Sequence, residues 1–529
     1  MKPEKQTKTV IYDATLREGE QRAGVVFSEY EKLKIISGLD SLGVDYIEVG
    51  FLSASNAERL IGLCEEAKSG EKGGARLSVL CAARRPGCRA EDDPALRLLA
   101  ASGVPAAAVV GKASSGQVTS VLGTSLEENL AMIADTVSFL KKAGKTVFFD
   151  AEHFFDGFAE DPGYAREVLN AARDADAVVL CDTNGATLPD EIAKTVSLIA
   201  AENGGGPRLG IHCHNDIGMA DASTVAAVLA GAGHVQLTVS GIGERCGNAD
   251  LTTVIPVLQL KLGIRCLSDG GLAVLSPIAR KICQTANLAF DESAPFVGAY
   301  AFSHKAGMHI DALLKNSQSF EHIDPRLVGN SRSLVLSELS GRAAVAEMLS
   351  RYGYRLAKGD PSIDMVLERM REEEKAGMQF DNSDASLRLL AGRVLGGISR
   401  PLEILDYKLI FSAGEASGQC WSAVVKFAVG GEPELSAGEG DGPVNALDVA
   451  AHRALSRVFP EIERVKMLDI KARIDANDSM ASASTVRVFV ESGDGDAVWH
   501  TMGASTDIIA ASWRALLDSY EYYVNFVLG

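Results

Sequence analysis

Between residues 10 and 263 the chain alternates short apolar runs with amphipathic segments, and this alternation restricts the fold more than any other feature. Each run is short and mostly apolar, as strands of a parallel sheet must be when both faces are covered. The strands are predicted at Thr9–Asp13, Tyr46–Val49, Leu77–Cys81, Ala107–Val110, Thr146–Phe149, Ala177–Cys181, Leu209–His212 and Val235–Val239. Eight strand–helix units in roughly 250 residues match a (β/α)₈ TIM barrel. An open, doubly wound sheet is the alternative.

The segments between these strands carry helix-start signals. Ser28 and Ser125 each precede a Glu by three residues, at Glu31 and Glu128, which is the spacing of a capping box. Pro189 lies where the first turn of another helix is expected, a position that tolerates the missing N–H. These signals support the alternating strand–helix pattern.

The chain changes character twice after the barrel. Residues 276–400 are mostly helical in pattern, and beyond Pro401 we expect the strands Leu405–Phe411, Trp421–Val429, Lys466–Ile474 and Thr485–Glu491 and the helices Asn445–Arg457 and Asp507–Tyr523. Glycine-rich turns are expected at Gly430–Gly431 and Gly438–Gly442. We therefore divide the chain into a TIM-barrel catalytic domain (1–275), a mostly helical linker region (276–400) and a C-terminal α+β domain (401–529).

Composition excludes several classes of protein. A net charge of −18 and the lack of a dense Lys/Arg run argue against a nucleic-acid or membrane-surface partner. Transmembrane helices need about 18 uninterrupted apolar residues, and the sequence offers no such window. The nine cysteines are odd in number and show no C-x-x-C spacing, so they indicate reduced thiols. We expect a soluble, cytoplasmic protein.

Unusual polar residues follow the predicted strands, where the reactive groups of TIM barrels lie. They occupy Asp13–Gln21 after the first strand, Asp150–His153 after the fifth, Asp182–Gly185 after the sixth, His212–Asp216 after the seventh and Gly241–Asn248 after the eighth.

His212 and His214 are the sharpest local signal in this set. Residues i and i+2 of a strand project to the same side, so both imidazoles can reach one ion, although two core histidines would show the same spacing. Glu18 and Asn248 follow strands one and eight, which are neighbours in a closed barrel, and they add oxygen ligands. Two nitrogens with oxygen ligands suit a divalent cation that keeps open positions for substrate. Arg17 is either an ion-pair partner of Glu18 or a group that stabilises an oxyanion.

Three motifs resemble those of the DRE-TIM metallolyases, the family that includes the 2-isopropylmalate, homocitrate and citramalate synthases. D-x-T-L-R-[DE]-G stands at Asp13–Gly19, H-x-H-N-D at His212–Asp216 and G-x-G-E-R-x-G-N at Gly241–Asn248. The resemblance implies a divalent metal (Mn, Mg, Zn and Co are not distinguished) held by Glu18, His212, His214 and Asn248. It also implies that Arg17, Gln21 and Thr183 hold a 2-oxo acid.

Within this family the long citramalate synthases are the closest likeness. Their motifs are matched at Asp150–Gly157, Ser303–His309 and Glu321–Asn330, and their last, regulatory-type domain at Thr485–Tyr522. The resemblance implies condensation of the co-substrate acetyl-CoA with pyruvate and water to (R)-citramalate and CoA, a precursor route to isoleucine. It further implies a homodimer and an amino-acid effector at the C-terminal domain, with isoleucine expected.

Two further catalytic residues follow from the same resemblance. His309 is the candidate base that removes a proton from the acetyl methyl group, and Glu152 would position or assist it. The alternative from the residues alone is that His309 is a surface or helix-capping histidine and that Glu152 is a structural partner of His153.

The sequence is compatible with several functions besides citramalate synthesis. The first motif, Arg17–Gln21, is closer to the homocitrate synthases, so 2-oxoglutarate competes with pyruvate as the substrate. The chain could also be a 2-isopropylmalate synthase, an aldol lyase of the same superfamily or an inactive, amino-acid-sensing barrel.

Overall fold

The computed structural model describes residues 8–528 except 69–73, 268–269, 305–311, 314, 335–341, 358, 381–382, 399–401, 415–417, 430 and 475–483. The chain divides into two compact units. The first comprises Met1–Phe302 and Ile323–Arg332, and the second comprises Ser303–His322 and Ser333–Gly529.

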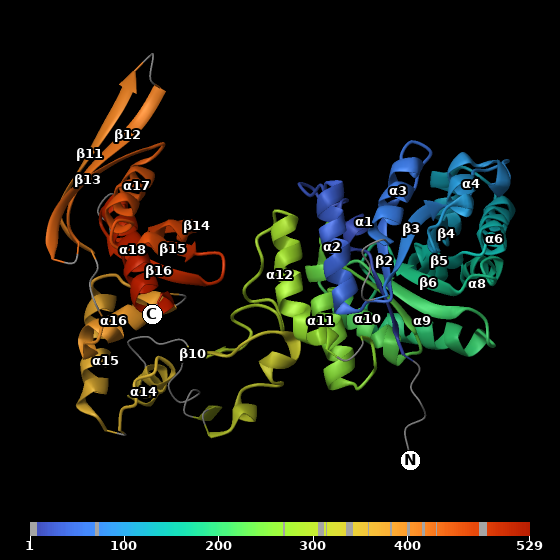
Figure 1. Cartoon of the computed structure of the whole chain (residues 1–529). Coiled ribbons are helices and arrows are strands. Elements are labelled where there is room, and N and C mark those ends of the chain that lie inside the picture. Colours follow the sequence, from blue (N-terminus) through green and yellow to red (C-terminus); the bar gives the residue numbers. More distant parts are fainter. Residues whose placement is uncertain are drawn as a thin grey trace. The chain divides into compact units, whose positions relative to one another are not determined.

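The first unit is a closed barrel of eight parallel strands (Figure 1). The strands are β1 (Val10–Asp13), β2 (Tyr46–Phe51), β3 (Arg76–Ala82), β4 (Ala106–Lys112), β5 (Thr146–Glu152), β6 (Ala177–Asp182), β7 (Arg208–Cys213) and β8 (His234–Leu237). β1 pairs with both β2 and β8, with Ile11 opposite Val235, and this pairing closes the ring. The predicted TIM barrel is therefore confirmed, and the open-sheet alternative is wrong.

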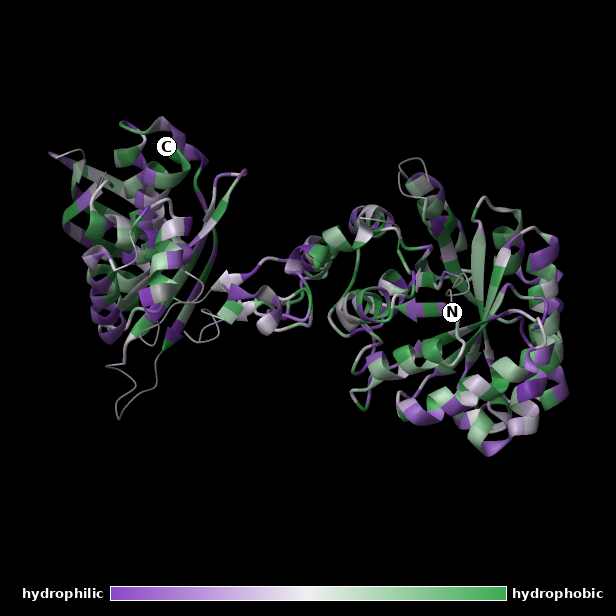
Figure 2. Ribbon diagram, turned by 90° about the horizontal axis from the view of Figure 1, so that it is seen from below, coloured by the Kyte–Doolittle hydropathy of each residue, from purple (hydrophilic) through white to green (hydrophobic). Residues whose placement is uncertain are grey.

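The helices that follow the strands surround the barrel. They are α2 (Glu29–Leu42), α3 (Ala57–Lys68), α4 (Pro94–Ala101), α6 (Leu126–Lys142), α7 (Phe154–Glu160), α8 (Pro162–Ala171), α9 (Pro189–Glu202), α10 (Ala220–Leu229), α11 (Leu251–Pro256) and α12 (Leu275–Thr285). In Figure 2 these helices alternate between hydrophobic and hydrophilic residues, as expected for helices with one buried side.

The predicted helix starts are observed with one difference. Ser28 and Glu31 form the complete capping box at α2. At α6 the Ser125 hydroxyl accepts a hydrogen bond from the Glu128 N–H (3.2 Å), but the Glu128 carboxylate accepts from Arg84 (2.8 Å) instead of returning to the cap. Pro189 is the first residue of α9.

Side chains inside the barrel form successive layers, because alternate residues of each strand point inward. Tyr12, Tyr46, Phe148 and His234 make a cluster of ring contacts in this interior, with Tyr46 and Phe148 centroids 4.8 Å apart. Two residues further along β2, β5 and β8 the inward positions are polar: Glu48, Asp150 and Gln236. An apolar layer thus gives way to a polar layer as the strands approach their C-terminal ends.

In the described part of the second unit, helices precede two small α+β layers. The helices are α14 (Arg342–Arg351), α15 (Pro361–Lys375) and α16 (Asp384–Leu395). The first layer is an antiparallel sheet of β11 (Leu402–Gly414), β12 (Gly418–Val429) and β13 (Glu432–Gly440) with α17 (Pro443–Leu455) packed on it. The second is a sheet of β14 (Lys466–Ile474), β15 (Val486–Gly493) and β16 (Val498–Ser505) with α18 (Ile508–Tyr522).

Two of these strands, β13 and β16, were not predicted from the sequence. β13 includes Gly438–Gly440, which we expected in a turn, and β16 lies in a segment where we expected no strand. Both strands have a glycine where a helix packs against them. A Cβ on Gly438 would lie 2.5 Å from the Ala446 carbonyl oxygen, and one on Gly503 would lie 2.1 Å from that of Ala511. The glycines permit close sheet–helix packing, and for that reason they do not mark turns.

Among the described residues, no helix combines the length and apolar character needed to cross a membrane.

The packing of α7 gives a test of the barrel fold. A Cβ on Gly157 would lie 2.4 Å from the Ala113 carbonyl oxygen, so Gly157→Ala should lower the free energy of unfolding by about 1–3 kcal/mol. Gly62, in α3, has nothing within 4 Å of such a Cβ, and Gly62→Ala should stabilise by about 0.5–1 kcal/mol because alanine favours a helix. Denaturant unfolding of both variants checks this pair. Equal effects of the two substitutions would contradict the packing argument.

Candidate functional site

Glu18, His212 and His214 meet at the C-terminal end of the barrel. Glu18 belongs to the short helix α1 (Thr15–Gly19) directly after β1, and the histidines lie at the end of β7. The Nε2 atoms of His212 and His214 are 3.2 Å apart, and His212 Nε2 is 3.5 Å from Glu18 Oε1. One ligand atom from each of the three residues lies within 4.8 Å of the others, and all three side chains are buried. This is a candidate metal site.

The protonation states of these groups suit a cation. Burial lowers the pKa of His212 to about 3 and also lowers that of His214, so both imidazoles are neutral near pH 7. Burial, the largest single influence, raises the pKa of Glu18, but the charge and hydrogen bond of Arg17 together with the two neighbouring histidines hold it below its usual range. Two neutral imidazoles and a carboxylate are donors that a divalent ion accepts.

Unsatisfied polar atoms give an independent test of this fit. Within the described residues, Glu18 Oε2 and both polar atoms of the Asn248 side chain are buried and have no hydrogen-bond partner, as do His212 Nδ1 and His214 Nδ1. Buried polar atoms without partners are rare in folded proteins, so such a group indicates a missing ligand. The residues present therefore fit a bound divalent metal.

Asn248 is brought to this site by the loop after β8. Its backbone forms an isolated antiparallel β-bridge with that of His214, and the residue is 3% exposed. A Cβ on Gly243 would lie 2.5 Å from Asn248 Oδ1, and one on Gly247 would lie 2.1 Å from the Gly241 carbonyl oxygen. Gly243 therefore makes room for the Asn248 carboxamide, and Gly247 lets the loop backbone approach Gly241 closely.

Arg17 lies beside the candidate metal site and is held by two carboxylates. Its guanidinium contacts Glu18, and its Nε donates to Glu48 Oε2 at 2.6 Å. Glu48 is completely buried, and its other oxygen accepts from the Tyr12 hydroxyl at 2.7 Å. Arg17 is thus an ion-pair partner of Glu18. The two carboxylates, which we call the Arg17 clamp, also fix the direction of the guanidinium at the edge of the site.

Glu48 and Gln236 were not predicted from the sequence, and Asp150 was named there only as part of the polar motif after the fifth strand. Asp150 Oδ1 accepts from Gln236 Nε2 at 2.8 Å, and burial raises the pKa of Asp150 to about 7. The available signal was a single acid within an apolar strand, since a charged residue is rarely buried without a partner. Glu48 in the strand Tyr46–Phe51 meets that criterion.

The remaining predicted residues surround the mouth of the barrel. The Thr183 hydroxyl accepts from the backbone N–H of His153 at 2.8 Å, and Gln21 is exposed after α1. Glu152 forms an ion pair with Lys112 at 2.6 Å, and its structural partner is therefore Lys112, at the end of β4. The alternative of a Glu152–His153 pair is not observed among the described residues, where His153 contacts Asp156 (3.3 Å). His309 lies outside the described residues.

Arg245 fixes the loops on one side of the mouth. It donates to both carboxylate oxygens of Asp216 (2.8 and 3.0 Å) and to the Thr183 carbonyl oxygen (2.7 Å). These bonds join the loops that follow β6, β7 and β8. Arg245 adopts a positive φ of 51° there, a conformation that a non-glycine residue rarely takes without such contacts.

Comparison with known proteins covers nearly the whole chain. Three family models match in succession: HMGL-like at residues 8–272, the homocitrate synthase post-HMGL domain-like family at 296–377 and the LeuA allosteric (dimerisation) domain at 381–524. The (R)-citramalate synthase of Aquifex aeolicus is 40% identical over 97% of this chain and 97% of its own. The (R)-citramalate synthase of Synechocystis sp. is 40% identical over 98% of this chain and 96% of its own. That of Streptomyces coelicolor is 39% identical over 97% of this chain and 96% of its own.

Removal of one imidazole tests the candidate metal site. Even the outer hydrogen-bond partners of metal ligands contribute about 10–100-fold to affinity, so His212→Ala should weaken binding of a divalent ion by more than about 100-fold. Glu18→Ala should act in the same direction. Metal content after dialysis and titration with Mn²⁺ and Zn²⁺ measure this, with His500→Ala as the control because its side chain is 51% exposed on β16. Wild-type affinity in His212→Ala would show that the site is wrongly placed.

Proposed function

Since the chain belongs to the family of the (R)-citramalate synthases, within the HMGL-like proteins, we propose that it condenses acetyl-CoA with pyruvate and releases (R)-citramalate and CoA. The observation that supports this proposal most is the meeting of Glu18, His212 and His214 beside the clamped Arg17. The reaction is a Claisen-type condensation followed by hydrolysis of the thioester.

Glu18, His212, His214 and Asn248 would hold the metal. A divalent ion bound there supplies a Lewis acid that polarises the ketone of a 2-oxo acid. Its identity among Mn, Mg, Zn and Co is left to experiment, because all four accept this donor set.

Arg17 and Thr183 are assigned to the oxo acid. Arg17 stabilises the negative charge that develops on the ketone oxygen when the new carbon–carbon bond forms. The clamp by Glu48 and Glu18 means that the guanidinium needs little reorientation during the reaction, and such preorganisation is what lowers a barrier. The Thr183 hydroxyl accepts a hydrogen bond from the backbone N–H of His153, and it can still donate its own proton to the carboxylate of the oxo acid. Gln21, four residues after Arg17, is also assigned to the oxo acid.

Proton removal from the acetyl methyl group is assigned to His309, assisted by Glu152. The methyl carbon then attacks the ketone carbon, the resulting alkoxide takes up a proton, and water cleaves the thioester to release CoA. Glu152 is 29% exposed, so its carboxylate can accept a hydrogen bond from the N–H of the neutral imidazole and stabilise the cation that forms when the methyl proton is transferred.

Charge at the barrel mouth favours pyruvate over 2-oxoglutarate. The polar layer next to Arg17 is acidic, with Glu48 and Asp150 both buried. Lys112 pairs with Glu152, Arg84 with Glu128 and Asp135, and Arg245 with Asp216. A second carboxylate on the substrate would meet the like charge of this layer. Homocitrate synthesis, suggested by Arg17–Gln21, is disfavoured on this ground.

The C-terminal unit is assigned to assembly and regulation. Its LeuA-type match supports a homodimer that binds a small amino-acid effector, with isoleucine expected because citramalate leads to it. Ile410 and Leu435, exposed on one face of the β11–β13 sheet, offer an apolar surface that a second chain would cover.

A substrate panel tests the proposed reaction. CoA release from acetyl-CoA should be fastest with pyruvate among pyruvate, glyoxylate, 2-oxobutyrate, 2-oxoisovalerate and 2-oxoglutarate. It should disappear with a chelator and return with a divalent metal. Preference for 2-oxoglutarate would favour homocitrate synthesis, and no release with any oxo acid would favour the lyase or the sensor.

Replacement of Arg17 tests its role at the ketone oxygen. Arg17→Lys keeps the charge but cannot bridge Glu18 and Glu48, so kcat should fall by about 100-fold or more. Arg166→Lys is the matched control, since Arg166 also pairs with a carboxylate, Glu202, but on the outer helices. An unchanged kcat in Arg17→Lys would exclude Arg17 from the reaction.

A further inference from the structure

A cavity of about 400 Å³ lies at the N-terminal end of the barrel, at the opposite end of the strands from the candidate metal site. We call it the N-terminal cavity, because the first residue of every strand except β4 contributes to its lining. Its size falls within the range of about 300–1,000 Å³ that small-molecule sites occupy. No residue assigned to the proposed reaction lines this cavity.

The lowest layer of side chains inside the barrel is polar at this end. It consists of the first residues of β1, β3, β5 and β7, which are Val10, Arg76, Thr146 and Arg208. Register partners in a parallel sheet point to the same side, so Arg76 faces inward with its partner Tyr46. Layers of this kind are usually filled by branched apolar residues. Arginine at two of the four positions therefore departs from the usual filling of a barrel.

Arg76 is held at the cavity by neutral groups. Its Nη1 donates to the Tyr46 hydroxyl and its Nη2 to Thr146 Oγ1, both at 2.9 Å, and its guanidinium lies over the Tyr46 ring. The aliphatic part of Arg208 packs on the backbone just before β8, where a Cβ on Gly233 would lie 3.4 Å from Arg208 Cγ. Among the described residues, neither guanidinium forms a salt bridge with a carboxylate. Two positive charges are thus left uncompensated at this end of the barrel.

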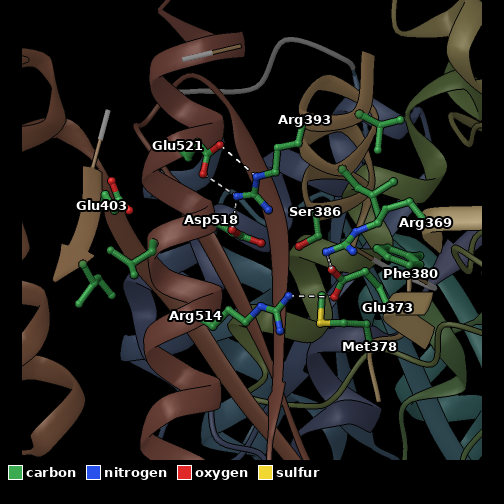
Figure 3. A pocket seen from close by; sticks show the side chains of 14 residues that line it. Arg369, Glu373, Met378, Phe380, Ser386, Arg393, Glu403, Arg514, Asp518 and Glu521 are labelled. Atoms are coloured by element: carbon green, nitrogen blue, oxygen red, sulfur yellow. Dashed lines mark hydrogen bonds and ion pairs between the residues drawn. The ribbon is translucent and has the colours of Figure 1, made fainter. Parts of the chain in front are cut away.

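Arginines that converge elsewhere in this chain are accompanied by carboxylates. In the C-terminal unit, Arg514 pairs with Glu373 at 2.9 Å (Figure 3). Arg393 in the same unit pairs with Asp518 at 2.6 Å and with Glu521. Like charges repel, so such clusters need anions among them. The arginines of the N-terminal cavity lack this compensation within the described part of the chain.

The carboxylates beside these two arginines are engaged by lysines. Asp45 and Asp176 each accept the backbone N–H of one of the arginines at their carbonyl oxygen. The side chain of Asp45 pairs with Lys8, and that of Asp176, which lines the cavity, pairs with Lys141 at 2.8 Å. The charge of the two guanidinium groups is therefore available to an anion from solution.

His234 is a second, independent sign of a ligand in this cavity. The residue lines the cavity, is 1% exposed, and its Nε2 has no hydrogen-bond partner among the described residues. Burial and the charge of Arg208 lower the pKa of His234 to about 3, so the imidazole is neutral and carries one N–H. A Cβ on Gly210 would lie 3.0 Å from His234 Cδ2, so glycine there makes room for the ring. Buried polar atoms without partners are rare, and this one lies beside the uncompensated arginines.

We propose that the N-terminal cavity binds a small dianion between Arg76 and Arg208. The two guanidinium groups would balance its charge, and His234 with its proton on Nε2 would donate a hydrogen bond to it. The rings of Tyr46 and Phe148 offer apolar contact to a carbon part. Inorganic phosphate and a short dicarboxylate share this chemistry. Because β3 and β7 stand opposite each other in the ring of eight strands, the bound anion would join two sides of the barrel. The inference does not depend on the proposed reaction.

Calorimetric titration of the full chain tests the ligand class. It is carried out at constant ionic strength and mildly alkaline pH, where inorganic phosphate is mainly a dianion. Phosphate or succinate should bind about tenfold or more tightly than acetate and chloride, which carry one charge. Tighter binding of phosphate would indicate a compact ligand and tighter binding of succinate an extended one, and either result supports the proposal. Equal affinity for the dianions and for acetate would overturn it.

Substitutions test the place of binding. Arg208→Gln should raise the Kd of the tighter dianion by about tenfold or more, and it leaves no group unpaired, because Arg208 has no side-chain partner in the described chain. His234→Phe keeps a ring at this position and should act in the same direction. Arg97→Gln is the matched control, since it removes the same charge from an exposed site on α4 outside the cavity. CoA release without added anion should be unchanged in Arg208→Gln and Arg97→Gln.

The outcomes separate this inference from the proposed function. A wild-type Kd in Arg208→Gln would place any bound dianion elsewhere and overturn the assignment of the cavity. No binding of phosphate or succinate to the wild-type chain would overturn it as well. Arg208→Gln decides the case by itself if His234→Phe does not fold, as judged by circular dichroism. Absence of CoA release in the wild-type chain would bear on the reaction alone.

Discussion

The ion pairs of Arg17 inside the barrel organise the rest of the candidate site. A guanidinium that is only 8% exposed has lost most of its hydration, and it remains charged because Glu18 and Glu48 lie against it. Glu48, in turn, is completely buried and depends on Arg17 and the Tyr12 hydroxyl. Breaking such a buried pair by removing one partner typically costs about 3–5 kcal/mol, so each member restrains the others. The same contact that fixes Arg17 also places Glu18 beside His212.

This arrangement explains why the barrel interior is divided into layers. The ring cluster of Tyr12, Tyr46, Phe148 and His234 fills this level of the barrel with ring contacts. Beyond it, Glu48 accepts hydrogen bonds from Arg17 and Tyr12, and Asp150 accepts one from Gln236. A low-dielectric floor strengthens the electrostatic interactions above it, which is useful where charge develops on a substrate oxygen. The fold therefore supplies both rigidity and local polarity at one end of the strands.

The C-terminal unit repeats one design twice, although no repeat is visible in the sequence. Three antiparallel strands are followed by a helix in residues 402–455 and again in residues 466–522. In each case a glycine of the third strand lets the helix approach: Gly438 meets α17 and Gly503 meets α18. Backbone approach depends on the absence of a side chain, and many unrelated sequences share that property. For this reason the repeat is structural, with little trace in residue identity.

The sequence by itself determined the eight strands, the helix caps at Ser28 and Ser125, and the grouping of Glu18, His212, His214 and Asn248 at one end of a barrel. These features follow from local rules: apolar periodicity, capping geometry and the common direction of parallel strands. Only the tertiary structure decided which charges meet. Glu48 clamps Arg17, Lys112 and not His153 pairs with Glu152, and Arg393 joins α16 to α18. Partners such as Arg17 and Glu48 are 31 residues apart, and their contact is set by barrel closure and side-chain direction. Local sequence patterns predict neither barrel closure nor side-chain direction, because an ion pair forms wherever the fold brings two opposite charges into contact.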